Sequence, residues 1–170
     1  MKYLLFICFL IPAIVNAQMQ PVQPTFAELA ASGQEGPQPF KGANTIHIYT
    51  TDSASVAYDR FAAILLEAGY SLKMADKSLR ALSTESRPAP RYNVSHHLRA
   101  SVVQTASGAE IRIRDSFALP SAAAVSSVMA GEQETVCRGM QGSPFMVCWA
   151  EIQRLASLYP KGIVMYSKKP

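Results

Sequence analysis

The chain has 170 residues and carries 16 lysines and arginines against 12 aspartates and glutamates, a formal net charge of +4. This weak positive charge gives no support to nucleic-acid binding, and the length predicts a single domain large enough to bury a real core. The sequence contains no P-loop, no dinucleotide fingerprint and no G-x-S-x-G elbow, so the common signatures of nucleotide and serine-hydrolase chemistry are absent.

Residues 1–17 have the pattern of a secretory signal peptide. Lys2 supplies a positively charged start, residues 3–15 form an apolar run, and the residues that follow place the cleavage site before Gln18. The apolar run is short for a membrane span. We therefore expect an exported protein, periplasmic or extracellular, with no membrane span after cleavage; the alternative is an uncleaved N-terminal anchor.

Residues 18–43 are rich in proline, glutamine, glycine and serine, which is typical of a flexible leader. Residues 44–170 are predicted to form a single α+β domain. It opens with a strand at residues 44–50, where isoleucines alternate with polar or aromatic residues.

A helix is predicted next, because Asp52 or Ser53 can cap its start and Gly69 suits its end. Short strands follow at residues 72–74 and 79–82, separated by a turn.

The clearest pattern is a hairpin within residues 92–119, with Ser107-Gly108 at its turn. Residues 121–131 are predicted as a short helix and the following stretch as a loop. Ser143-Pro144 then marks the start of a second helix. Residues 162–168 form a last strand.

The predicted order is therefore β-α-β-β-β-β-α-β. Strands in series with two helices indicate an α+β fold in which one antiparallel or mixed sheet of about five to six strands packs both helices on one face.

Residues 44–83 resemble a known type of exported module. A strand, a helix that ends in EAGYSL, then Asp76 and ALST resemble the exported βαββ modules of the TBP-like fold families. These families include envelope proteins and the BamC-type lipoprotein modules. The likeness covers about forty residues and rests on the layout of elements. It implies a TBP-like fold and an envelope role, and it carries over no catalytic motif. The chain lacks the lipidated cysteine of BamC-type proteins.

Two cysteines, Cys137 and Cys148, remain outside the signal peptide. An exported location and an even number of cysteines favour a disulfide between them. Two alternatives stay open: inert buried thiols, or a catalytic thiol with a distant histidine. There is no C-x-x-C motif and no histidine near either cysteine in sequence, so no zinc site is predicted.

The remaining polar residues do not form a recognisable reaction centre. His96 and His97 are neighbours on a strand, so their side chains point to opposite faces and cannot share one ion without a bulge. No two carboxylates have a spacing that indicates acid–base hydrolysis. We predict no catalytic residue, no metal and no cofactor.

One face of the predicted hairpin is basic and polar. With Ser107-Gly108 at the turn, Arg99 would lie opposite Ser116 and share a face with His97, Arg112 and Arg114. The interpretation without a specific function is a solvated face whose charges keep the sheet soluble. The sharper interpretation is a docking surface for an acidic protein segment, a carboxylate polymer or a phosphate group, because arginine binds such groups well.

The sequence thus predicts a non-enzymatic exported protein that acts as an interaction or ligand-binding module. Its partner would be an envelope protein or an anionic polymer. The alternative function is a small hydrolase or thiol-active enzyme, with a site built from Cys137 or Cys148 and a distant histidine.

Overall fold

The computed structural model describes residues 35–89, 94–119 and 131–168. The predicted signal peptide lies outside these ranges, as does the predicted helix at residues 121–131 apart from its last residue. Within the described ranges, neither helix is long and apolar enough to cross a membrane.

Nine strands and two helices make up the described part of the chain. The strands are β1 (Glu35–Gly36), β2 (Thr45–Thr50), β3 (Leu72–Asp76), β4 (Ala81–Thr84), β5 (Arg87–Pro88), β6 (Ser95–Thr105), β7 (Gly108–Ala118), β8 (Glu132–Glu134) and β9 (Ile163–Ser167). The helices are α2 (Ala54–Glu67) and α3 (Pro144–Ser157).

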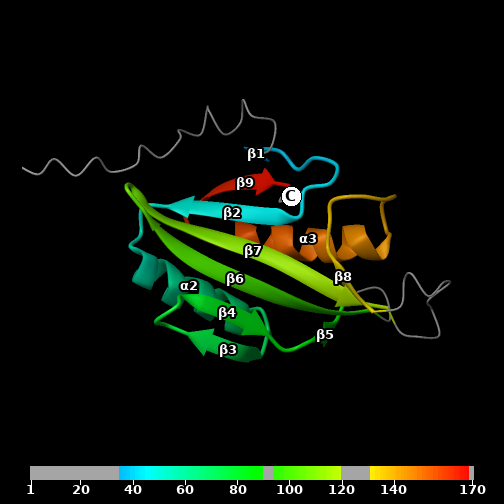
Figure 1. Ribbon diagram of the computed structural model, residues 1–170, viewed down its shortest axis with the longest axis horizontal. Helices are drawn as coiled ribbons and strands as arrows, with labels where there is room; N and C mark the ends of the chain where they lie inside the picture. The colour runs from blue at the N-terminus through cyan, green and yellow to red at the C-terminus, as the bar shows by residue number, and fades with distance from the viewer. Residues whose placement is uncertain (1–34, 90–93, 120–130, 169–170) are drawn as a thin grey trace, which may run out of the picture.

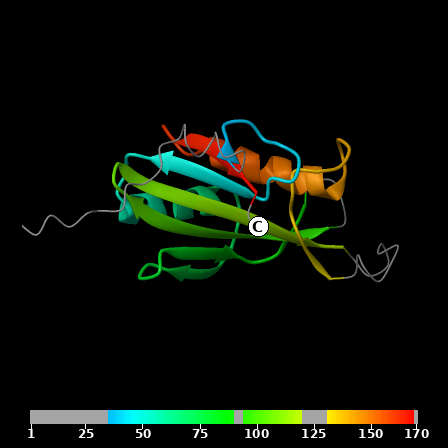
Figure 2. The ribbon, with the colours of Figure 1, turned by 45° about the horizontal axis from the view of Figure 1, so that its top comes forward.

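The strands form one antiparallel sheet in the order β1-β9-β2-β7-β6-β4-β3, with β5 paired to β6 and β8 paired to β7 (Figure 1). The longest strands are β6 and β7, each of 11 residues, and they form a hairpin through the middle of the sheet. The β3–β4 pair forms the lower end of the sheet in Figure 2.

Both helices begin where the sequence predicts. The Ser53 hydroxyl accepts from the backbone N–H of Val56, and the Ser143 hydroxyl plays the same part before Pro144. Such caps satisfy backbone donors that the first turn of a helix leaves unpaired. After α2 the chain turns at Gly69, whose φ of 81° favours glycine.

The two helices cover the same face of the sheet, as predicted, and enclose one main core. That core joins the apolar sides of α2 and α3 to the inward residues of the sheet. Its largest fully buried members are Trp149, Phe61, Ile46, Ile48, Leu65, Leu82, Leu98, Ile111, Ile113, Ile152 and Leu155. Strict alternation along β6 and β7 supplies the sheet side of this core, because successive side chains of a strand point to opposite faces.

The sheet has more strands than the five to six predicted. The additional strands β1, β5 and β8 are only two or three residues long, and periodicity cannot be recognised over so few residues. Pro88 lies in β5, and proline argues against a strand in sequence.

The described part of the predicted leader, residues 35–43, packs on the domain. β1 pairs with β9, and Ala43 is fully buried. The backbones of residues 42–43 also form two hydrogen bonds with the backbone of Cys137. The Gly42 N–H donates to the Cys137 carbonyl at 2.9 Å, and the Cys137 N–H donates to the Ala43 carbonyl at 2.7 Å. These bonds join the start of the domain to the loop before α3.

The two outer strands of the sheet are short or irregular. β1 has two residues, and β3 has five with a register shift between Leu72 and Met74 where it pairs with β4.

Gly108 provides a test of the close approach between β7 and β2. Its φ is 147°, and an added Cβ would lie 2.0 Å from the Thr50 carbonyl oxygen. We expect Gly108→Ala to lower the free energy of unfolding by more than about 2 kcal/mol, because backbone of β2 and β7 must separate. Urea denaturation measures this change.

The matched control is Gly131→Ala. Gly131 also has a positive φ, of 115°, but an added Cβ meets no atom of the described residues within 4 Å. It should cost about 1 kcal/mol, from backbone conformation alone. Equal losses in the two variants would contradict the close approach at Gly108.

Candidate functional site

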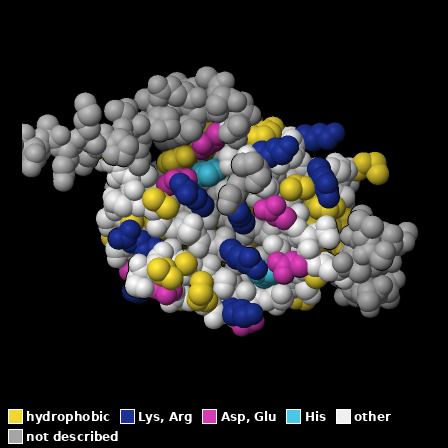
Figure 3. All heavy atoms as spheres, viewed as in Figure 1, with side chains coloured by type: hydrophobic (Ala, Val, Ile, Leu, Met, Phe, Trp, Pro, Cys, Tyr) yellow, Lys and Arg dark blue, Asp and Glu magenta, His cyan; other side chains and the backbone are white. Residues whose placement is uncertain are grey.

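The face of the sheet opposite the helices carries the polar residues singled out in the sequence. This open face is turned toward the viewer in Figures 1 and 3, and lysine and arginine side chains gather over its middle, interspersed with carboxylates. The inward face is apolar along most of its length, whereas the open face presents charged side chains to solvent.

The hairpin turn comes one residue earlier than predicted. Residues 106–107 form it, since Thr105 pairs with Gly108, and the register differs by two residues from the predicted one. Arg99 therefore lies opposite Arg114 rather than Ser116. A shift of two keeps every side chain on its face. The expected grouping of arginines on the open face survives, and two of them are cross-strand neighbours.

Arg112 is held in an internal ion pair. Its Nε and Nη2 donate to the two carboxylate oxygens of Glu110 at 2.8 and 2.7 Å. Glu110 also accepts from His47 Nδ1 at 2.7 Å, and the other ring nitrogen of His47 lies 2.6 Å from the Ser167 hydroxyl. Arg112 is thus already matched by a bidentate carboxylate, and the structure does not favour its predicted role in binding.

Burial alone would raise the pKa of Glu110, but the hydrogen bonds and charges of His47 and Arg112 outweigh it. Together they lower the pKa from its ordinary value of 4.5 to about 2. Glu110 is 6% exposed, so its partners stabilise a nearly buried charge. These three side chains brace β2 against β7.

The open face is hollowed at the end of the β6–β7 hairpin that lies away from the turn. A pocket of about 350 Å³ lies where β4, β6 and β8 meet. Its lining is polar or charged except for one alanine: Lys73, Ser83, Thr84, Glu85, Ser86, Ser95, His97, Arg99, Ala118 and Glu132. Two of the predicted binding residues, His97 and Arg99, therefore line one pocket.

Glu132 holds the cationic part of this pocket loosely. Its carboxylate lies 3.5 Å from His97 Nε2 and 3.6 Å from Arg99 Nη2. The side chains of Arg99 and Glu132 are 67% and 51% exposed, and such long, solvated ion pairs contribute little. Arg114, the neighbour of Arg99 on β7, has a different partner, because its Nε donates to the Thr45 hydroxyl of β2 at 3.2 Å. Arg99 can therefore exchange Glu132 for the carboxylate of a ligand at a small cost in free energy.

Sequence reasoning missed Lys73 and Glu132. Lys73 was visible as the polar residue of a short alternating strand, although nothing indicated that β3 would lie near β6. Glu132 lies in β8, in a stretch predicted as loop, and no sequence signal places it against Arg99.

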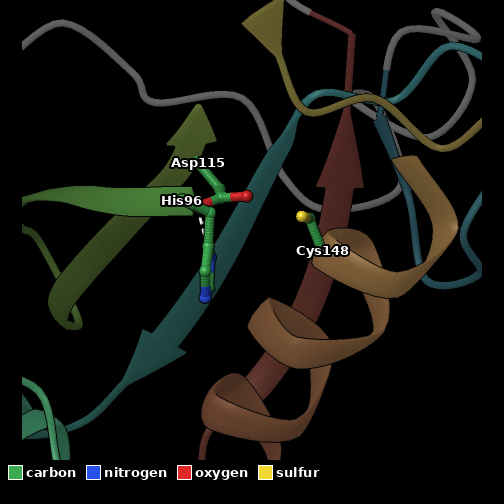
Figure 4. A group of neighbouring side chains, drawn as sticks. All are labelled: His96, Asp115 and Cys148. Atoms are coloured by element: carbon green, nitrogen blue, oxygen red, sulfur yellow. Dashed lines mark hydrogen bonds and ion pairs between the residues drawn. The ribbon is translucent and has the colours of Figure 1, made fainter. Parts of the chain in front are cut away.

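A second polar cluster lies on the inward face, under the N-terminal half of α3. His96 of β6, Asp115 of β7 and Cys148 of α3 converge there, with the carboxylate between the imidazole and the sulfur (Figure 4). None of the three is more than 1% exposed. His96 Nδ1 donates to Asp115 at 3.0 Å, and the Thr135 hydroxyl donates to the other carboxylate oxygen at 2.5 Å. His96 and His97 do point to opposite faces, as predicted.

The predicted disulfide between Cys137 and Cys148 is not formed in the structure, where both are free thiols. Cys137 packs against the main core, whereas Cys148 belongs to a separate apolar cluster with Ala89, Val94 and Phe117. The two cysteines thus lie in different packing environments.

The same surroundings argue against a nucleophilic thiol. Burial, with the carboxylates of Asp115 and Glu151, raises the pKa of Cys148 to about 12. Burial raises the pKa of Cys137 as well. A reactive cysteine needs access and a lowered pKa.

Comparison with known proteins adds no relative to this picture. No protein-family model matches the chain, and the search of curated proteins found no significant match.

The Glu110 brace predicts a specific pH dependence. A carboxyl whose pKa is lower in the folded than in the unfolded state stabilises the fold above its unfolded pKa, and that contribution is lost as the pH falls through the folded pKa. Glu110→Gln should therefore lower the free energy of unfolding at pH 7 by on the order of 2 kcal/mol. The deficit should shrink between pH 4.5 and 2.

Urea denaturation at pH 7 and pH 2.5 would measure both values. Glu67→Gln, at an exposed position of α2, removes the same charge without a buried partner and serves as the control. A deficit for Glu110→Gln that is the same at both pH values would contradict the brace.

Proposed function

We propose that this protein is a non-enzymatic, exported binding module whose open-face pocket binds an acidic peptide segment of an envelope protein. The observation that carries the proposal is the position of Glu132, which places a glutamate side chain from a strand between His97 and Arg99. The pocket thus already holds the chemical group that it would recognise, in contacts too long to be strong.

The rest of the lining fits a peptide. Ser83, Ser86 and Ser95 offer hydroxyl groups that can donate to or accept from a peptide backbone. Lys73 and Arg99 are balanced by Glu85 and Glu132, so the pocket is not a simple anion trap. The hydroxyl groups favour a partner with backbone amides beside its carboxylates, which an acidic peptide has and a uniform carboxylate polymer does not.

Export is supported by the sequence of residues 1–17, with its basic start, apolar run and cleavage pattern. The resemblance of residues 44–83 to exported TBP-like and BamC-type envelope modules supports the same location. The competing thiol-enzyme hypothesis is disfavoured by the raised pKa and complete burial of Cys148.

Arg99 should contribute measurably to binding. Arg99→Gln should weaken binding of a fluorescently labelled glutamate-rich decapeptide by about three- to tenfold, the loss of one charged hydrogen-bond pair near the surface. Fluorescence polarisation at low salt measures it, with an unlabelled polyuronate as competitor.

The matched control is Lys77→Gln, which removes one charge from the far end of the β3–β4 hairpin, where Lys77 pairs with Asp59. Binding should change less than twofold. Equal weakening by both variants would show a nonspecific charge effect. Polyuronate that displaces the peptide at equal carboxylate concentration would favour the polymer as the partner instead.

Glu132 provides a prediction of opposite sign. If its carboxylate competes with a ligand for His97 and Arg99, Glu132→Gln should tighten peptide binding by about three- to tenfold. Glu134→Gln, two residues along β8, is the control, since Glu134 accepts from Asn44 outside the pocket. Weaker binding by Glu132→Gln would contradict the competition and assign this residue a direct role in the pocket.

A further inference from the structure

The inward cluster of His96, Asp115 and Cys148 has the composition of a metal site. Each residue offers one ligand atom, and the three atoms all lie within 4.8 Å of one another. The ligands come from the two strands of the β6–β7 hairpin and from α3, which follows much later in the chain. Neighbouring positions along the chain therefore could not indicate them, and the sequence predicted no metal.

We infer that this cluster binds one zinc ion, or a similar thiolate-binding divalent metal, through one ring nitrogen of His96, a carboxylate oxygen of Asp115 and the sulfur of Cys148. Imidazole, thiolate and carboxylate together are a typical zinc ligand set. A tetrahedral zinc places its ligand atoms about 3.3–3.8 Å apart. The separation of at most 4.8 Å needs side-chain adjustments of about an ångström to reach this range.

Charge balance favours a divalent cation. The site is buried, and an isolated carboxylate or thiolate in such surroundings is costly. A divalent cation that binds one carboxylate and one thiolate gives a site with no net charge. The ion would thus remove the cost of burying Asp115 and of deprotonating Cys148 in the same step.

The imidazole supplies the nitrogen ligand. His96 Nδ1 bonds to Asp115, and the buried Nε2 has no hydrogen-bond partner among the described residues. Figure 4 shows that Nδ1 faces the carboxylate and that Nε2 points away from Asp115 and Cys148, so Nδ1 is the nitrogen that would hold the ion. Zinc would take the place of the proton in the Nδ1–Asp115 hydrogen bond.

Neighbouring residues already orient the ligands. The Thr135 hydroxyl holds Asp115, and the Tyr70 ring packs edge-to-face on His96 with centroids 6.0 Å apart. Such outer contacts set the direction of ligand side chains in known metal sites. The three side chains supply three of the four ligands of a tetrahedral ion. The site is closed to substrate, so its role is structural: it ties α3 to the end of the β6–β7 hairpin.

The test uses the full chain, stripped with a chelator and titrated with cobalt(II). One equivalent should give the sulfur-to-cobalt charge-transfer absorption of a thiolate ligand, and zinc should abolish it. Zinc alone should raise the melting temperature by at least about 5 °C. Cys148→Ser should lose the band and the zinc effect, while Cys137→Ser, which removes the other described thiol, should keep both. Circular dichroism checks that each variant is folded.

His96→Gln is the second variant, because it keeps a polar side chain of similar length. It should weaken cobalt binding at least tenfold while the Cys148 thiol remains free. Three results would overturn the inference: no thiolate band in the wild type, a band that persists in Cys148→Ser and is lost in Cys137→Ser, or a Cys137–Cys148 disulfide in the native protein by non-reducing mass spectrometry.

Discussion

The pairing of β6 with β7 is the constraint on which the rest of the structure depends. These two strands run side by side for their whole length and form the largest interface in the sheet. Every second residue points under the helices, so one pairing register determines both the core and the open face. β2 and β9 extend the sheet from the β7 side, and β4 and β3 extend it from the β6 side. The pocket and the buried cluster are thus opposite sides of one end of this hairpin.

That end of the hairpin departs from the pattern of the rest. Toward the turn, the inward positions are Ala100, Val102, Ile111 and Ile113, and all are buried and apolar. At the far end, His96 and Asp115 take the same inward positions and bring two ionisable groups into the core. Polar residues at core positions weaken packing unless something compensates them. A function that needs these groups is the simplest reason for their presence.

The elements that the sequence predicts well are those with local signals. Ser53 and the Ser143-Pro144 pair mark both helix starts because capping depends on residues within one turn. The alternation of the hairpin strands assigned Arg99, Arg112 and Arg114 to the open face even with the turn misplaced by one residue. The features that the sequence did not predict depend on contacts between segments that are distant in the chain. Glu110 neutralises Arg112, β8 brings Glu132 to Arg99, and α3 places Cys148 over His96. The inward direction of His96 was foreseeable from alternation, but the helix residue that faces it was not.

The edges of the sheet limit how a partner can approach. An open strand edge presents unpaired backbone groups and invites a further strand, from another protein or from a second copy. Here β1 ends the sheet after two residues, and β3 is interrupted by a bulge between Leu72 and Met74. Neither edge offers a regular ladder of hydrogen bonds to an added strand. The described edges of the sheet thus disfavour edge-to-edge polymerisation, so a partner must approach through side chains on the open face.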